Sequence, residues 1–278
     1  MAFSRISGPS LFRVSLVVFL FAVAASAQTA TNPAAKSKGI LLEQLTWDQA
    51  ERVLTEDRVV VIALGAELKE HGRHLQLNND FLMAEYFKRR MLDAADVVVA
   101  PTINYSFYPA FVEYPGSTTV QLHTARDMVV EIVRTLAKFG PKRFYILNTG
   151  ISTIRPLKEA QALLATDGIA MRFTDLSRFD SIEKQVRQSG GTHADEVETS
   201  MMLYIAPESV DMKKAVRDLH EDKPGPLTRD PNGRGVYSPT GAWGDPTLAT
   251  KEKGKIVVEG MVAAILKEIG DLRTEQLK

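Results

Sequence analysis

A polar stretch that follows an apolar segment carries the side chains best suited to chemistry. Residues 65–80 read Gly-Ala-Glu-Leu-Lys-Glu-His-Gly-Arg-His-Leu-Gln-Leu-Asn-Asn-Asp and come directly after the valine-rich run 59–64. A loop that only connects two elements has no need of so many ionisable groups, so we expect metal ligands or acid/base groups here. The candidates are Glu67, Glu70, His71, His74 and Asp80.

A second polar segment, 190–200, reads Gly-Gly-Thr-His-Ala-Asp-Glu-Val-Glu-Thr-Ser and leads into an apolar helix predicted over 201–205. It adds His193, Glu196 and Glu198 to the candidates. A catalytic metal needs ligands from several loops and one position left open to water. The chain has no cysteine, so any metal must be held by nitrogen and oxygen atoms. Solvated polar loops are the alternative interpretation of the same residues.

Strand-like and helix-like segments alternate along the chain and would position these loops. The predicted strands are 58–64, 97–101, 118–122, 143–147 and 169–173, and the predicted helices are 41–54, 81–92, 124–139, 154–165 and 251–269. We expect Thr46, Asp80 and Thr124 to cap helices. The alternation predicts an α/β fold with a mostly parallel sheet covered on both faces. Ligands bind at the carboxyl ends of the strands in such sheets.

Length and composition restrict the class of protein. With 278 residues and 45% hydrophobic content, the chain can form one large domain with a substantial core. The formal net charge is zero, so we expect no nucleic-acid partner. Residues 218–247 are rich in Gly, Pro and Asp and predict a long irregular segment, which serves as a lid, an oligomer contact or a disordered region.

The N-terminus has the pattern of an export signal. Basic residues precede an apolar run at 14–24, and Ala-Ser-Ala follows at 25–27, which predicts a signal peptide over residues 1–27. An uncleaved anchor is the alternative, but the run is short for a bilayer span. We expect a disordered linker over 28–38, a folded domain over 39–278, no membrane association after cleavage, and a secreted or periplasmic location.

Four motifs resemble those of one family and keep the same order along the chain. Residues 70–80 resemble the Gln-His-Gly-Pro-His-Leu-Pro-Leu-Gly-Thr-Asp signature of the creatininase (creatinine amidohydrolase) family, and 193–200 resemble its His-Ala-Gly-Glu-Val-Glu-Thr-Ser. Tyr-Pro-Gly-Ser at 114–117 is similar to its Phe-Pro-Gly-Thr, and 244–254 match its C-terminal segment. Colinear motifs are a stronger signal of fold than of activity.

The resemblance implies a three-layer α/β/α sandwich that forms a homo-oligomer, often a hexamer, and hydrolyses small cyclic or linear amides with two divalent metals, commonly zinc or manganese. Carried over by position, His71 would bind one metal, Asp80 would bridge both, and Glu196 would be a further carboxylate ligand. His193 would transfer protons near the substrate, with Glu198 close by. Water activated by the metals would attack the amide carbon.

Several positions depart from the family pattern. Lys69 stands where the family has a glutamate ligand, so Glu67 or Glu70 could take over as the ligand. Gly150 stands where the family has a ligand histidine, and a glycine has no side chain to coordinate with. The histidine that the family has ahead of its Phe-Pro-Gly-Thr motif is replaced by Phe111.

Two interpretations therefore stay open. In one, the chain is a hydrolase of altered specificity with a single metal, held by His71, Asp80, Glu196 and Glu70. In the other, it is a non-catalytic binding or assembly protein that keeps the fold.

The remaining aromatic and basic candidates have more ordinary expected roles. We expect His74 to pack or hydrogen-bond within its loop, and His123 and His220 to lie at the surface or at caps. Trp243 is expected at an oligomer interface rather than in the pocket. Lys69 is either solvated or supplies positive charge beside Asp80, and the latter favours the non-catalytic interpretation.

Overall fold

The computed structural model describes residues 37–220 and 225–277. The predicted signal peptide, and all but the last two residues of the predicted linker, lie outside the described residues. Within the described ranges, no helix combines the length and the apolar character that crossing a membrane requires.

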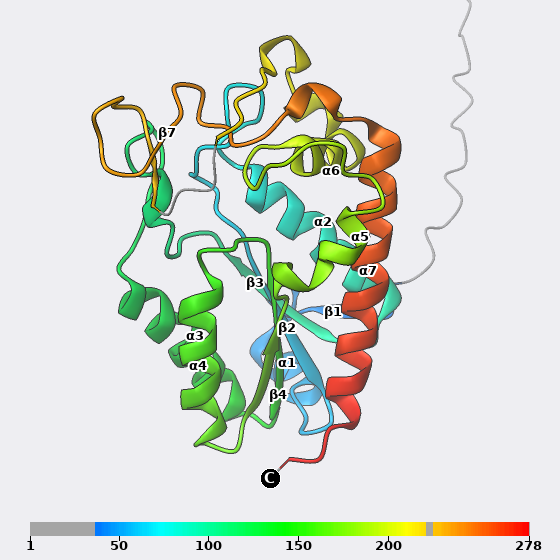
Figure 1. Cartoon of the computed structure of the whole chain (residues 1–278). Helices are drawn as coiled ribbons and strands as arrows, with labels where there is room; N and C mark the ends of the chain where they lie inside the picture. The colour runs from blue at the N-terminus through cyan, green and yellow to red at the C-terminus, as the bar shows by residue number, and fades with distance from the viewer. Residues whose placement is uncertain (1–36, 221–224, 278) are drawn as a thin grey trace, which may run out of the picture. The chain divides into compact units, whose positions relative to one another are not determined.

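A five-stranded parallel sheet forms the centre of the fold (Figure 1). Its strands are β1 (Ile40–Leu41), β2 (Val59–Leu64), β3 (Val98–Ile103), β4 (Arg143–Asn148) and β5 (Ala170–Phe173), in the order β1-β3-β2-β4-β5. After β2 the chain places β3 on one side, and β4 then pairs with the other side of β2. The loops after β2 and β4 therefore separate at a topological switch point, where parallel sheets bind ligands.

Helices cover both faces of the sheet. They are α1 (Trp47–Val53), α2 (Asn79–Ala94), α3 (Leu122–Ala137), α4 (Ile154–Ala165), α5 (Asp180–Glu183), α6 (Glu196–Ile205) and α7 (Lys251–Thr274). Alternate residues of β2 point to opposite faces: Val61 belongs to the core formed with α2, α6 and α7, and Ile62 to the core formed with α3 and α4. The predicted α/β/α sandwich with a mostly parallel sheet is confirmed.

Some element predictions were wrong. The strand predicted over 118–122 does not form, because the Thr118 N–H donates to the Leu68 carbonyl and the Val120 N–H to the Ser106 carbonyl, outside any sheet. The helix predicted to be capped by Thr124 begins two residues earlier, at Leu122.

The described parts of the segment 218–247, residues 218–220 and 225–247, are irregular, as predicted, except for two short parallel strands, β6 (Leu227–Thr228) and β7 (Val236–Tyr237), and a 3-10 turn that begins at Pro246. It is tied to the body of the fold, since the Tyr114 hydroxyl donates to the Ser238 carbonyl at 2.7 Å. The backbone of Trp243 pairs with that of His193, which brings the segment next to the second polar loop.

Candidate active site

The loop after β2 folds back so that its two ends meet. A Cβ atom on Gly65 would lie 2.3 Å from the Asp80 carbonyl oxygen, so only glycine lets the first turn of α2 pack this closely on the end of β2. The Phe81 N–H donates to the Ala66 carbonyl and the Lys69 N–H to the Leu77 carbonyl. These contacts bring Asp80, which lies inside the first turn of α2, back to the loop residues that precede it.

His71 and Asp80 form a fully buried pair at this closure. Nδ1 of His71 donates to the Lys69 carbonyl at 2.9 Å, so its Nε2 is the nitrogen directed at other groups. Nε2 lies 2.8 Å from Oδ1 of Asp80 and 3.4 Å from Oε1 of Glu198. Burial acts to raise the pKa of Asp80, but the charges of Lys69 and His71 outweigh it and hold that pKa well below its usual range. Asp80 is therefore a carboxylate.

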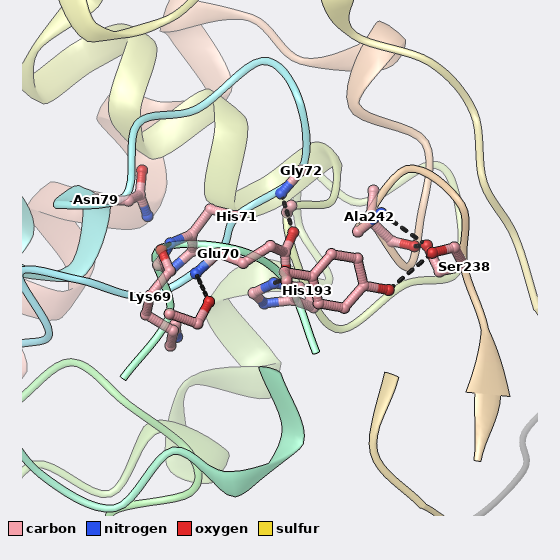
Figure 2. A network of polar contacts seen from close by, with 12 residues as sticks. Lys69, Glu70, His71, Gly72, Asn79, His193, Ser238 and Ala242 are labelled. Carbon is pink, nitrogen blue, oxygen red and sulfur yellow. Dashed lines mark hydrogen bonds and ion pairs between the residues drawn. The ribbon is translucent and has the colours of Figure 1, made fainter. Parts of the chain in front are cut away.

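The second polar loop contributes a histidine and a carboxylate to the same place. Nε2 of His193 donates to Oε2 of Glu70 at 3.1 Å (Figure 2). Its Nδ1 lies 4.0 Å from Oε2 of Glu198. Burial opposes the charged form of His193, but Glu70 and then Glu198 outweigh it and raise the pKa of His193. The Ala194 N–H donates to Glu198 at 2.7 Å, from a backbone with φ of +46°. That left-handed conformation is uncommon outside glycine and aims the amide at the carboxylate.

Three of these side chains form a set that fits a metal ion. His71, His193 and Glu198 each offer one ligand atom, and these atoms lie within 4.8 Å of one another. Two imidazoles and one carboxylate are a ligand set that suits zinc, and nitrogen and oxygen donors also bind manganese. Nε2 of His71, moreover, faces two acceptor oxygens, and this arrangement needs positive charge, supplied by a proton or by a metal ion. The residues present therefore fit one divalent ion.

Glu196, predicted as a ligand, has its carboxylate engaged elsewhere. It is fully buried, but Oε1 lies 2.5 Å from Nζ of Lys253, and Oε2 accepts the N–H groups of Gln188 and Ser189. Burial acts to raise its pKa, but the Lys253 hydrogen bond and the two amides lower it overall. The contacts of Glu196 hold α7 and the residues before α6 together, and the structure does not bring it to His71.

The other loop residues also have defined partners. Glu67 accepts from the Asn104 side chain at 2.6 Å, and Glu70 pairs with His193, so neither contacts Asp80 in the way that a replacement ligand would. His74 hydrogen-bonds the Thr199 hydroxyl at 2.8 Å, as expected for a packing histidine, and burial chiefly lowers its pKa to about 4.

The residues expected at the surface divide between two environments. His123 is exposed, as predicted. His220 is partly buried, and its Nε2 lies 3.0 Å from Oδ1 of Asp218. The Trp243 ring lies edge-on to His220 at 6.0 Å between centroids, so Trp243 borders the site through its backbone, and its predicted interface role stays a prediction.

A cavity of about 560 Å³ opens onto the His193 and Glu198 side chains. Its size is typical of small-molecule sites. Sequence reasoning missed most of its wall, which is largely apolar and includes Met83, Phe87, Leu176, Val197, Met201 and Met261. It also missed Arg187, which binds Oδ2 of Asp195 at 2.6 Å while Oδ1 of Asp195 caps α6. The position of Asp195 directly before a predicted helix indicates a capping carboxylate, and that was the sequence signal that could have pointed to a basic partner such as Arg187.

Comparison with known proteins identifies similar chains. A family model described as Creatininase: Creatinine amidohydrolase matches residues 43–269. A creatinine amidohydrolase of Pseudomonas putida is 26% identical over 260 residues, which cover 84% of this chain and 97% of that protein. A mycofactocin precursor peptide peptidase of Mycolicibacterium smegmatis is 26% identical over 214 residues, covering 73% of this chain and 81% of that protein.

A solved structure agrees in fold. The crystal structure of a creatinine amidohydrolase (creatininase) superposes with a TM-score of 0.69 at 24% identity, and covers 87% of this chain and 100% of that chain. At this identity the superposition establishes the architecture of the sandwich and leaves the chemistry to the site residues.

Proposed function

Because the chain belongs to the creatininase family, we propose that it is a metal-dependent hydrolase that cleaves a carbon–nitrogen bond of a small cyclic or linear amide. One divalent ion, zinc or manganese, would be held by His71, His193 and Glu198. The observation that carries the proposal is Nε2 of His71, which faces two carboxylate oxygens while Nδ1 is committed to the backbone. Creatininase structures described as a manganese form and as a Zn-Zn type support the choice of metals.

A bound ion would supply a water molecule of lowered pKa and would polarise the amide carbonyl. The chain's own residues prepare that chemistry. Glu70 accepts the Nε2 proton of His193 and so leaves Nδ1 directed toward Glu198, available as a ligand or as a proton carrier. Asn79 donates to Oε1 of Glu198 at 3.0 Å and, with the Ala194 N–H, fixes both oxygens of this carboxylate. His193 and Glu198, expected from the resemblance to act at the substrate, are here assigned to the metal as well.

Export and assembly belong to the same proposal. The pattern of residues 1–27 supports a secreted or periplasmic protein with no membrane association after cleavage. The family resemblance supports a homo-oligomer, with a hexamer as the specific expectation.

One observation favours a second candidate function, a non-catalytic binding or assembly protein. Nζ of Lys69 lies 2.7 Å from Oδ2 of Asp80, with both side chains buried. An ammonium in this position places positive charge beside Asp80 without any metal.

Elemental analysis of the purified mature protein tests the choice between the two functions. We expect about one equivalent of zinc or manganese per chain, retained after dialysis. Asp80→Ala should abolish this retention, because the Asp80 carboxylate lies 2.8 Å from Nε2 of His71 and supplies negative charge beside an ion bound there. His123→Ala, at an exposed position in α3, serves as the matched control and should retain the metal. Substoichiometric metal that added zinc or manganese does not restore would exclude the hydrolase, and equal retention in both variants would remove Asp80 from the site.

A further inference from the structure

Lys69 is a buried charge for which the proposed chemistry gives no role. Its residue is 5% exposed, and its ammonium is paired with Asp80, whose side chain is 1% exposed. Removing two charges from water costs several kcal/mol per ion, and a buried pair often adds no stability. The position of Lys69 is therefore weak evidence for a stabilising role and stronger evidence for a functional one.

The surroundings of the ammonium are shaped to hold it. Nζ lies 4.8 Å from the centre of the Phe111 ring and 5.6 Å from that of the Tyr108 ring, at distances where aromatic faces attract a cation. The Phe111 ring also stacks on His193, with 4.3 Å between centroids. Lys69 thus lies between the buried carboxylate and the aromatic wall of the cavity, which it lines.

Gly150 belongs to the same arrangement. A Cβ atom on Gly150 would lie 3.0 Å from Oγ1 of Thr153 and 3.3 Å from Cε1 of Tyr108, so a side chain at this position would require these neighbours to shift by a few tenths of an ångström. The missing side chain at Gly150 admits the ring that faces Lys69. The two positions that depart from the family pattern, Lys69 and Gly150, therefore share the Tyr108 ring as a neighbour.

Around the loop after β4, the side chains of Asn148, Thr149 and Thr153 already have hydrogen-bond partners. The Asn148 side chain donates to the Gly150 carbonyl at 2.7 Å, and its oxygen accepts the hydroxyl of Thr153. Thr149 donates to the carbonyls of Leu64 and Asp80. These polar groups hold the turn together and join it to the ends of β2 and α2.

We infer that the Lys69 ammonium takes the place of one of the two cations that the family resemblance implies. The site then holds one divalent ion at His71, His193 and Glu198, and a fixed organic cation at Asp80, where it faces any ligand bound in the cavity. This inference rests on the proposed function for the first ion, but the claim about Lys69 can be tested separately. It involves no covalent step, because Lys69 acts only through its charge.

The test is the stoichiometry of zinc binding, measured by calorimetric titration of the metal-stripped full-length mature protein. We expect one tight equivalent for the wild type and a second equivalent for Lys69→Glu, which replaces the cation by a carboxylate beside Asp80. Lys88→Glu is the matched control, since the Lys88 side chain is 12% exposed and pairs with Glu85 at 3.2 Å. It makes the same charge change away from the site and should stay at one equivalent.

The outcomes separate the two claims. Two equivalents in the wild type, or an unchanged count in Lys69→Glu, would overturn the inference about Lys69. A wild type that binds no zinc, with a Lys69→Glu variant that does, would refute the hydrolase but support the inference; no binding in either would refute both. If Lys69→Glu fails to fold, Lys69→Gln tests the same point, with a second equivalent expected to bind about tenfold or more weakly than the first.

Discussion

A glycine at the contact between α6 and α7 should control both stability and the metal site. A Cβ atom on Gly254 would lie 1.8 Å from the Ser200 carbonyl oxygen, a backbone atom that cannot turn aside. The helices would have to separate, and overpacking of this kind costs about 1–3 kcal/mol. Because the contact is so short, we take the upper end of that range. The better helix propensity of alanine offsets about 1 kcal/mol of it.

Gly254→Ala should therefore destabilise the protein by roughly 2 kcal/mol, which lowers the Tm by roughly 4–8 °C for a domain of this size. Gly270→Ala is the control in the same helix, since nothing lies within 4 Å of its Cβ position. It should gain up to about 1 kcal/mol from helix propensity alone. Thermal unfolding of the two variants checks the opposite signs, and a Tm that rises in both would refute the packing argument. As a second measurement, Gly254→Ala should weaken zinc binding, because α6 carries Glu198.

Two further predictions concern carboxylates away from the proposed metal. Glu196→Gln should lower the Tm but leave zinc stoichiometry unchanged, since the Glu196 carboxylate serves Lys253 and two backbone amides; loss of bound zinc would return Glu196 to the ligand set. The Arg90 hydrogen bond chiefly lowers the pKa of Glu259, so this pair between α2 and α7 contributes stability above about pH 4.5 that is lost as the pH falls. As the pH falls, the Tm of the wild type should therefore decrease more steeply than that of Glu259→Gln. The corresponding difference in the free energy of unfolding should stay below about 1 kcal/mol. Parallel curves of Tm against pH would contradict this prediction.

The parts of the fold that the sequence predicted are those decided by local pattern. The run Val59–Leu64 is apolar at every position, and a strand buried on both faces requires that pattern. The segment 118–122, Thr-Thr-Val-Gln-Leu, is β-branched at its first three positions, yet its amides pair with the carbonyls of Leu68 and Ser106. Residue types do not show whether a neighbouring strand is available for pairing. A strand-like segment that lacks a partner strand therefore cannot be distinguished from a true strand by its sequence.

In the candidate site too, contacts within one loop follow from local sequence, whereas contacts between distant segments do not. His71 and Asp80, both predicted as ligands, are brought together because they come from one loop whose ends meet at the start of α2. Glu196 was predicted as a ligand from its position in a motif, and the structure places its carboxylate against Lys253, 57 residues away and on another helix. Glu70 follows Lys69 directly, yet the two side chains serve different groups, His193 and Asp80, because neighbouring residues of an irregular loop need not share a direction.

Charge balance connects the Lys69 substitution to the number of ions. The buried centre contains three carboxylates, Asp80, Glu70 and Glu198, and the ammonium of Lys69 neutralises one of them. Two negative charges remain, which one divalent ion compensates while both imidazoles stay neutral ligands. A second divalent ion beside Lys69 would leave excess positive charge in a buried site, at a cost of several kcal/mol. Without any ion, those two negative charges would remain uncompensated around the two imidazoles, whose ring centroids lie 5.1 Å apart. Charge balance thus supports the proposed single divalent ion, and replacing Lys69 is the change that we expect to alter that number.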